Sequence, residues 1–196
     1  MYFPANRESL DVKVQAPYVM AQIRALRSSI FKKSPEVQAA LIIADRIERT
    51  YDLTREDLFL PAFDTFNAIL EPFAKSVLTG TLREIGYELF PQYVSVLKIP
   101  RANVNVALGI TKPEDALRAV CDGYRRSVTG SDAGTLVLST AGSTTTVIDT
   151  TFVPCALFMG IFLGAGKLTG LFRANALIER RCRARGERAC SYDFVF

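Results

Sequence analysis

Hydrophobic residues recur at helical spacing through most of the first two thirds of the chain. Their period of three to four positions predicts a series of amphipathic helices. Ser34 and Pro35 form an N-cap followed by a proline at the first helical position, and a capping box over 111–114 begins the last helix of this part. The predicted helices cover residues 16–30, 35–50, 54–61, 62–80, 82–90 and 112–127, with an extended arm over 1–15 and a proline-bracketed connector over 91–101.

The pattern then changes from helical to alternating. The strand-like runs cover residues 134–142, 143–151, 173–185 and 189–196, with an apolar helix over 154–166 between the second run and the third. Gly142 and Gly186 mark the turns that join the runs into two hairpins. The chain is therefore predicted to be an α+β protein in which helices cover an antiparallel sheet of about four strands.

The domain organisation follows from length and from the lack of linkers. The chain has 196 residues and shows no internal repeat or low-complexity tract. Residues 1–90 are expected to supply an arm and helices that pack on the remainder or mediate dimerisation, and residues 91–196 to form an α/β part that contains the candidate site. The two parts are expected to be one structural unit, because one hydrophobic core can fill a chain of this length.

Composition removes several classes of chemistry. Hydrophobic residues make up 49% and charged residues 22%, which is ordinary for a globular protein, but the chain contains no histidine. Without imidazole, a Ser-His-Asp or Cys-His triad, a His-ligated haem and an HExxH zinc protease are all excluded. Any metal site must therefore be built from cysteine and carboxylate side chains.

Membrane and nucleotide motifs are also incomplete. The uncharged stretch 150–166 has 17 residues, whereas a membrane span needs about 20, so no membrane span is expected. The Gly166-Lys167 pair lacks the earlier glycine and the following Ser or Thr of a phosphate-binding loop, which argues against a nucleotide cofactor. The N-terminus lacks the pattern of a secretory signal, so a cytoplasmic location with reduced cysteines is expected.

Three of the four cysteines lie where the predicted topology can bring them together. Cys182 and Cys190 flank the second hairpin turn, Cys155 begins the apolar helix, and Glu179 precedes Cys182 by three residues. Three thiolates and one carboxylate suit a closed, structural zinc site, although buried thiols are also common as plain core residues. Residues three apart on a regular strand face opposite sides, so a shared metal requires an irregularity near 180–181. The fourth cysteine, Cys121, is interpreted as a packed thiol.

The last segment of the chain is rich in arginine. Residues 173–188 hold six arginines, which are interpreted as solvated side chains on an exposed strand. Aromatic residues that would stack on bases are poorly interleaved with them, so no nucleic-acid partner is expected.

The ending of the chain resembles the 4-vinyl reductase domain family. The residues that carry the resemblance are Pro154-Cys155, Glu179-x-x-Cys182, Gly186 and Cys190-x-Tyr192-x-Phe194, within a region of about residues 90–196. The family is similar in fold to the small subunits of the TRAPP tethering complex and to haem nitric-oxide sensor domains. The resemblance implies a compact α/β fold that dimerises through helices, and a structural zinc ion bound by Cys155, Glu179, Cys182 and Cys190 beside an apolar pocket.

The sequence also departs from that family. Phenol-sensing relatives hold the ligand hydroxyl with His and Trp, and haem sensors need an axial His, but this chain contains neither residue type. Phenol binding in that manner is therefore in doubt, and haem bound by that route is excluded.

Three functions remain open at this point. The first is a non-catalytic regulatory or sensor module that binds a small apolar ligand and acts through a downstream partner protein. Its candidate pocket residues are of a kind that is more often ordinary core: Phe66, Phe73, Tyr124, Phe158 and Phe162. The second is a homodimeric scaffold or adaptor without a ligand. The third, a subunit of a tetrapyrrole vinyl reductase, rests on the family name, because no dinucleotide or flavin motif and no acid–base pair is evident.

Overall fold

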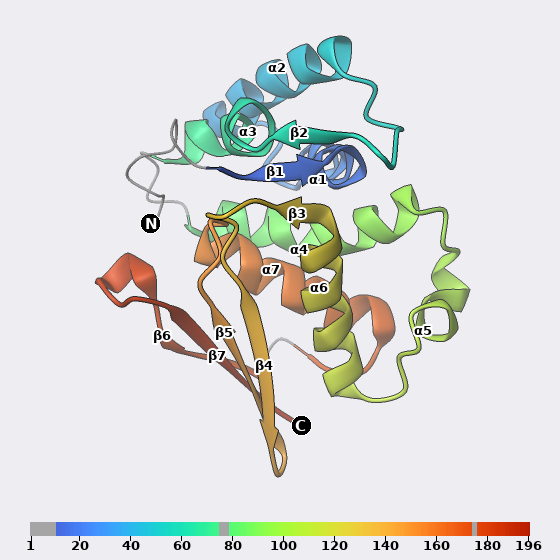
Figure 1. Cartoon of the computed structure of the whole chain (residues 1–196), viewed down its shortest axis with the longest axis vertical. Helices are drawn as coiled ribbons and strands as arrows, with labels where there is room; N and C mark the ends of the chain where they lie inside the picture. Colours follow the sequence, from blue (N-terminus) through green and yellow to red (C-terminus); the bar gives the residue numbers. More distant parts are fainter. Residues whose placement is uncertain (1–10, 75–78, 174–175) are drawn as a thin grey trace.

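Helices dominate the first two thirds of the chain and strands the last third (Figure 1). The computed structural model describes residues 11–74, 79–173 and 176–196. The α-helices are α1 Ala16–Ser28, α2 Pro35–Thr50, α3 Ala68–Leu70, α4 Thr79–Val96, α5 Val104–Ala107, α6 Pro113–Ser127 and α7 Cys155–Thr169. The strands are β1 Lys13–Gln15, β2 Phe59–Pro61, β3 Val128–Thr129, β4 Leu136–Ala141, β5 Thr144–Asp149, β6 Leu177–Arg181 and β7 Cys190–Val195. Tighter or wider helical turns are η2 Phe63–Asn67, η3 Glu71–Phe73, η4 Arg101–Asn103 and η6 Arg183–Arg185.

The main sheet confirms the predicted α+β class. Its four strands are antiparallel and run in the order β4-β5-β7-β6. Side chains alternate across it: Val147, Tyr192 and Phe194 are buried on the inner face, whereas Val137 and Ile148 are exposed on the outer face. Helices therefore cover one face only, and the β4–β5 hairpin extends beyond them (Figure 1). Both hairpin turns contain a glycine with positive φ, Gly142 at 58° and Gly186 at 88°.

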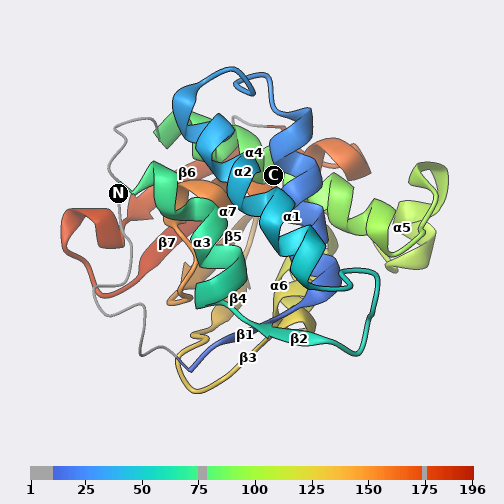
Figure 2. The ribbon, with the colours of Figure 1, turned by 90° about the horizontal axis from the view of Figure 1, so that it is seen from above.

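A second, smaller sheet was not predicted. It has the order β2-β1-β3, and Lys13 pairs with Pro61 on one side and with Thr129 on the other (Figure 2). The short helix predicted to end near Pro61 is wrong. The Asp52 carboxylate accepts hydrogen bonds from the backbone N–H of Thr54 at 3.1 Å and from its hydroxyl at 2.6 Å, and this local turn leads into β2 instead of a helix.

The other predicted helices near the N-terminus are largely confirmed. Helix α2 has the predicted bounds, and the Ser34 hydroxyl accepts a hydrogen bond from the backbone N–H of Val37 at 3.3 Å. The capping carboxylate of α6 is Asp115 rather than Glu114, and it accepts the backbone N–H groups of Thr111 and Lys112. The segment predicted as one helix over 62–80 contains successive turns η2, α3 and η3, and residues 75–78 lie outside the described part of the chain.

Helix α4 continues through the segment that was predicted to be a connector. It runs without interruption past Pro91 to Val96. A proline in a helix interior removes one hydrogen bond, here to the Tyr87 carbonyl, at a cost of about 3 kcal/mol. Burial of Leu82, Ile85 and Leu89 on the same helix offsets that cost, which local sequence signals do not reveal.

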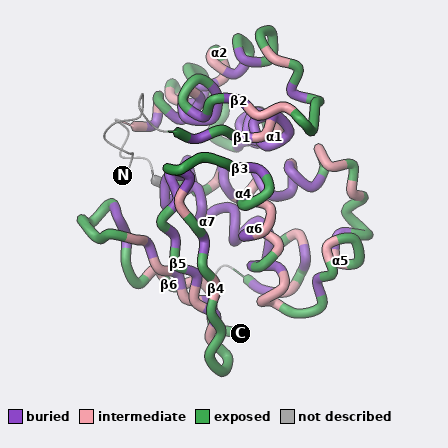
Figure 3. The backbone as a smooth tube through the Cα atoms, viewed as in Figure 1, coloured by how far each residue is buried: buried purple, intermediate pink, exposed green. Residues whose placement is uncertain are grey.

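Helix α7 is the central element of the fold. Nearly all of its residues are buried, and it lies against α4, α6 and the inner face of the sheet (Figure 3). Its Gly160 and Gly164 meet α4 at backbone distance, because a Cβ built on Gly160 would lie 2.0 Å from the Arg83 carbonyl oxygen and one on Gly164 would lie 2.2 Å from the Tyr87 carbonyl oxygen. The carbonyl group left without a helical partner by Pro91 therefore faces Gly164. Within the described residues, no helix combines the length and apolar character of a membrane span.

Substitution of Gly160 by alanine should destabilise the protein severely. The added methyl group would meet the α4 backbone, which cannot rotate away, so we expect a loss of at least about 3 kcal/mol in the free energy of unfolding. Gly80→Ala on α4 is the matched control: nothing lies within 4 Å of its Cβ position, and its stability should be unchanged or slightly higher. Urea denaturation of both variants tests the crossing, and equal midpoints would contradict it.

Candidate metal centre

Three cysteine side chains converge where α7, β6 and β7 meet. Cys155 is the first residue of α7, Cys182 follows β6, and Cys190 is the first residue of β7. Their sulfur atoms all lie within 4.8 Å of one another, and the Sγ atoms of Cys155 and Cys182 are 3.2 Å apart. The three residues are 0% to 5% exposed. The residues that sequence spacing selected thus form a group that can hold a metal ion.

The local backbone explains how the hairpin brings its two cysteines to one side. The pairing of β6 with β7 shifts register between Glu179 and Arg181, which confirms the predicted irregularity. After Cys182 the chain makes the η6 turn, which ends at Gly186 in the left-handed region. The backbone N–H of Arg183 then donates a hydrogen bond to the Cys190 sulfur at 3.3 Å. This turn fixes the position of the third sulfur.

The predicted fourth ligand lies beside this group and does not join it. Glu179 Oε2 forms an ion pair with Arg185 Nη2 at 3.3 Å, while its Oε1 atom is buried and has no hydrogen-bond partner among the described residues. Burial raises the pKa of the Cys182 thiol, and the neighbouring Glu179 carboxylate acts in the same direction. A buried oxygen without a partner next to a thiol is the arrangement that a bound cation would satisfy.

Hydrogen bonds within the cysteine group shift the pKa values of two of its thiols in opposite directions. Hydrogen bonds, first from the Cys155 thiol and then from the Arg183 backbone, hold the pKa of Cys190 well below its usual range. The same hydrogen bond, together with burial, raises the pKa of Cys155. Because thiolates are the form that binds a metal, a lowered thiol pKa within this group favours metal binding. Cys121 lies apart on α6, where burial raises its pKa to about 11, consistent with a packed thiol.

A buried ion pair lies directly beside the cysteines and was not predicted from the sequence. Arg183 was interpreted as a solvated side chain, but it is 5% exposed, and its Nη2 lies 3.3 Å from Asp149 Oδ2. The guanidinium also donates to the backbone carbonyls of Thr151 and Val153. The interpretation holds for the exposed arginines of this segment, which include Arg173, Arg180, Arg181, Arg185 and Arg188. Nothing in the sequence distinguishes Arg183 from these neighbours.

The carboxylate of Asp149 is held by several donors. It accepts hydrogen bonds from the Thr151 backbone at 2.8 Å and from the Thr151 hydroxyl at 2.7 Å, and the Tyr192 hydroxyl donates to it at 3.4 Å. Burial raises the pKa of Asp149 to about 6, although Arg183 opposes the increase. Tyr192 also reaches the Cys155 carbonyl at 3.4 Å, so the ion pair and the cysteine group share one buried corner.

The aromatic residues predicted to line a pocket are buried. Ring contacts run from Phe66 through Phe152 and Tyr124 to Phe158 and Phe162. Phe73 is buried in η3 and does not take part in these ring contacts. Tyr124 and Phe158 border a void of only about 10 Å³, so these side chains are packed against one another in this structure.

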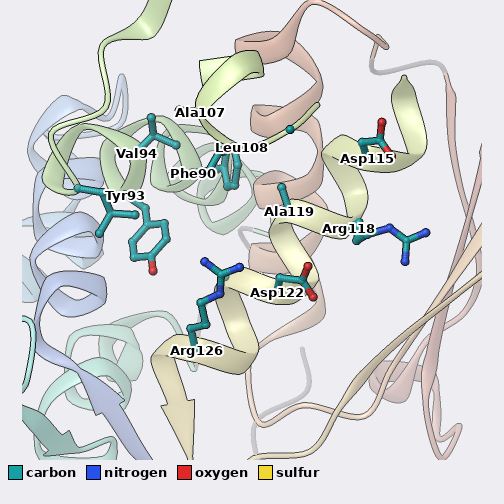
Figure 4. A pocket seen from close by; sticks show the side chains of 13 residues that line it. Phe90, Tyr93, Val94, Ala107, Leu108, Asp115, Arg118, Ala119, Asp122 and Arg126 are labelled. Atoms are coloured by element: carbon teal, nitrogen blue, oxygen red, sulfur yellow. The ribbon is translucent and has the colours of Figure 1, made fainter. Parts of the chain in front are cut away.

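A larger cavity lies next to this void, between α4, α6 and the segment that follows α5 (Figure 4). Its volume is about 220 Å³. The lining includes Phe90, Tyr93 and Val94 of α4, Leu108 after α5, and Ala119 and Arg126 of α6. This α4–α6 cavity was not predicted from the sequence, because residues 91–96, which belong to α4, were predicted to lie in a connector.

Comparisons with known proteins add little to this description. No protein-family model matches the chain, and no curated protein matches it. A search of solved structures matched a variant of Tt H-NOX, with 14% sequence identity and a TM-score of 0.46, over 93% of this chain and 94% of that one. A likeness of this size carries no argument about a ligand or a function. The resemblance to the 4-vinyl reductase domain family therefore stays a prediction from the motif residues.

Removal of Arg183 should cost far more stability than removal of an exposed arginine. Arg183→Met leaves the Asp149 carboxylate buried without its counter-charge, for which we expect a loss of about 3–5 kcal/mol in the free energy of unfolding. Arg180→Met removes an ion pair with Asp193 in which the arginine is 59% exposed, and should cost less than about 1 kcal/mol.

The cost of Arg183→Met should also depend on pH. Asp149 has a folded-state pKa of about 6, above its ordinary value of 3.8, so its ionised form is the one that burial destabilises. Loss of Arg183 raises this pKa further, so the penalty should grow as the pH rises above about 6 and shrink towards about pH 5, where the carboxyl is protonated. A penalty that does not change with pH in chemical denaturation would contradict the pairing.

Proposed function

We propose that this protein is a non-catalytic regulatory module that binds a small ligand and contains a structural zinc ion. The observation that carries the proposal is the convergence of three buried cysteine sulfurs from three different elements within 4.8 Å. Cys155, Cys182 and Cys190 would supply three thiolates, and Glu179 the fourth donor. Zinc accepts this donor set, whereas a reducing environment disfavours disulfides as the alternative cross-link.

The residues present fit such an ion. A tetrahedral zinc site with Zn–S bonds of about 2.3 Å places sulfur atoms about 3.8 Å apart, and the described sulfurs already lie within 4.8 Å of one another. The Glu179 Oε1 atom is buried and has no hydrogen-bond partner among the described residues, so it could serve as the fourth ligand. The three sulfurs are thus close to the spacing of a zinc site, and the Glu179 side chain would have to move to join them.

The proposed zinc ion has a structural role. Four protein ligands leave no open position for water or substrate, so the ion would supply a cross-link rather than Lewis-acid catalysis. Cys155 anchors the N-terminus of α7, while Cys182 and Cys190 anchor the two sides of the β6–β7 hairpin. The cross-link would hold the first turn of the central helix against the edge of the sheet.

Ligand binding would occur in the α4–α6 cavity. The cavity is bordered by α4 and α6, and both helices contact α7, so a molecule bound there touches elements that pack on the central helix. A change in the position of α6 would then be passed to a partner protein at the surface. We propose a small molecule with an apolar body and a polar group, because the cavity lining is about equally apolar and polar.

Zinc binding has a direct test in native mass spectrometry. The purified full chain should carry one zinc ion per polypeptide, and chelation should remove it with a fall of several degrees in the melting temperature. Cys182→Ser should abolish stoichiometric binding, and Glu179→Gln should weaken it. Cys121→Ser is the matched control and should retain the ion, because Cys121 lies outside the cysteine group.

A metal-free protein whose stability is unaffected by a chelator would remove zinc from the proposal. Retention of the ion in Cys182→Ser together with its loss in Cys121→Ser would place the site elsewhere. Neither outcome depends on a ligand in the α4–α6 cavity.

A second candidate function is a homodimeric scaffold or adaptor. The observation that favours it is the outer face of the main sheet, where four large apolar side chains are 40% to 51% exposed: Val137, Ile148, Ile178 and Val195. Such a face is typical of surfaces that contact another protein. The same native spectra report the number of subunits, and a dimer that dissociates in Ile148→Asp without loss of zinc would favour the scaffold over the ligand-binding module.

A further inference from the structure

The α4–α6 cavity has the size and lining of a site for a small aromatic or short aliphatic molecule. Its volume is about 220 Å³, whereas an engineered apolar cavity of about 150 Å³ accepts a benzene ring. Phe90 and Val94 of α4 and Leu108 after α5 form an apolar floor (Figure 4). The space therefore suits one ring system with a substituent, or a chain of comparable volume.

A glycine in the middle of α6 keeps this cavity open. Gly123 has no close neighbour that requires it, because a Cβ there would meet only the Tyr93 ring, at an ordinary distance of 3.6 Å. Glycine inside a helix costs about 1 kcal/mol relative to alanine. Neither a tight backbone approach nor a left-handed conformation offsets that cost here. Any long side chain at this position would enter the cavity, and the absence of one preserves the space.

Some charged side chains at the rim of the cavity have ion-pair or hydrogen-bond partners and others have none among the described residues. Asp122 forms an ion pair with Arg125 at 3.1 Å, and the Asp115 carboxylate is occupied by the start of α6. Arg118 and Arg126 form no ion pair or hydrogen bond with any other described residue. In Figure 4 the Arg126 guanidinium turns towards the cavity, on the side of Tyr93, whereas Arg118 points away from it.

From this arrangement we propose that the α4–α6 cavity binds an amphipathic monocarboxylate, with its apolar body on Phe90, Val94 and Leu108 and its carboxylate on Arg126. The proposal rests on the ligand-binding function proposed above and names the chemical class of the ligand. A guanidinium matches the two oxygens of a carboxylate. The negative charge of Asp122 beside Arg126 opposes a dianionic phosphate, so a single negative charge is favoured.

The test uses 2-naphthoate as the probe and 2-naphthamide as its neutral isostere, titrated into the full-length protein by calorimetry. Naphthoate should bind at least about tenfold more tightly than the amide, since a hydrogen bond to a charged group contributes about 1.5–3 kcal/mol. Arg126→Met should lower naphthoate affinity at least about tenfold and leave amide affinity unchanged. Arg118→Met is the matched control and should change neither affinity by more than about twofold, because that side chain points away from the cavity.

The position of the bound probe is checked by filling the cavity. Gly123→Leu should abolish binding of both molecules, and Ala119→Leu provides a second filling variant, with melting temperatures confirming that each variant folds. Equal affinities for naphthoate and naphthamide with no effect of Arg126→Met would overturn the carboxylate proposal and leave an apolar ligand site intact. Binding of neither probe, or undiminished binding in both filling variants, would overturn this cavity as the ligand site. Neither result bears on the zinc site, which native mass spectrometry tests separately.

Discussion

The close approach of α7 to the backbone of α4 is the constraint on which the rest of the structure depends. An apolar helix buried on nearly every side needs neighbours at short range all around it, and side chains on both helices would keep their axes too far apart. Gly160 and Gly164 remove the side chains from the contact and let α7 rest on the carbonyl groups of Arg83 and Tyr87. The opposite side of α7 is then free to carry the aromatic rings that pack on the sheet. Pro91 is related to the same contact, because the Tyr87 carbonyl that it leaves without a helical partner lies against Gly164.

Different parts of α7 contact different parts of the protein. At its N-terminus, Cys155 meets the two cysteines of the last hairpin, and the buried Asp149–Arg183 pair adjoins them. A buried charge pair contributes little net stability, but either charge left alone is costly. The pair therefore makes the turn between Cys182 and Cys190 hard to displace, which preserves the spacing of the sulfurs. Farther along, α7 supports α6, whose outer side carries Gly123 and Arg126 at the cavity.

The sequence predicted most of the fold, and the failures have identifiable physical causes. Alternation and turn glycines were sufficient for the four-stranded sheet, and caps were sufficient for α2, because these signals act over a few residues. The short helix after Thr54 was wrong because an Asp52 side chain competed for the same backbone groups. The connector over 91–101 was wrong because tertiary burial outweighed a proline.

The same distinction between local signals and long-range packing applies to the candidate site. The spacing of Cys182 and Cys190 in a hairpin is a local feature, and with Glu179 it predicted the register shift at 179–181, whereas Cys155, 27 residues before Cys182, was included because the predicted topology can bring its helix to the hairpin. Arg183 looks like its exposed neighbours in the sequence, and only the fold turns it onto Asp149, 34 residues earlier in the chain. The α4–α6 cavity arises between elements whose packing no local pattern describes. Residues that act through local geometry were thus predictable, and those that act through long-range burial were not.

The central claim is that the three cysteines and Glu179 enclose a zinc ion, and X-ray absorption at the zinc edge tests it most directly. The protein as purified, without added metal, should show three sulfur neighbours at about 2.3 Å and one oxygen neighbour at about 2.0–2.2 Å, with no open coordination position. In Glu179→Gln the three sulfur neighbours should persist while the oxygen shell changes. A spectrum dominated by nitrogen or oxygen neighbours, or a purified protein without zinc, would contradict the account.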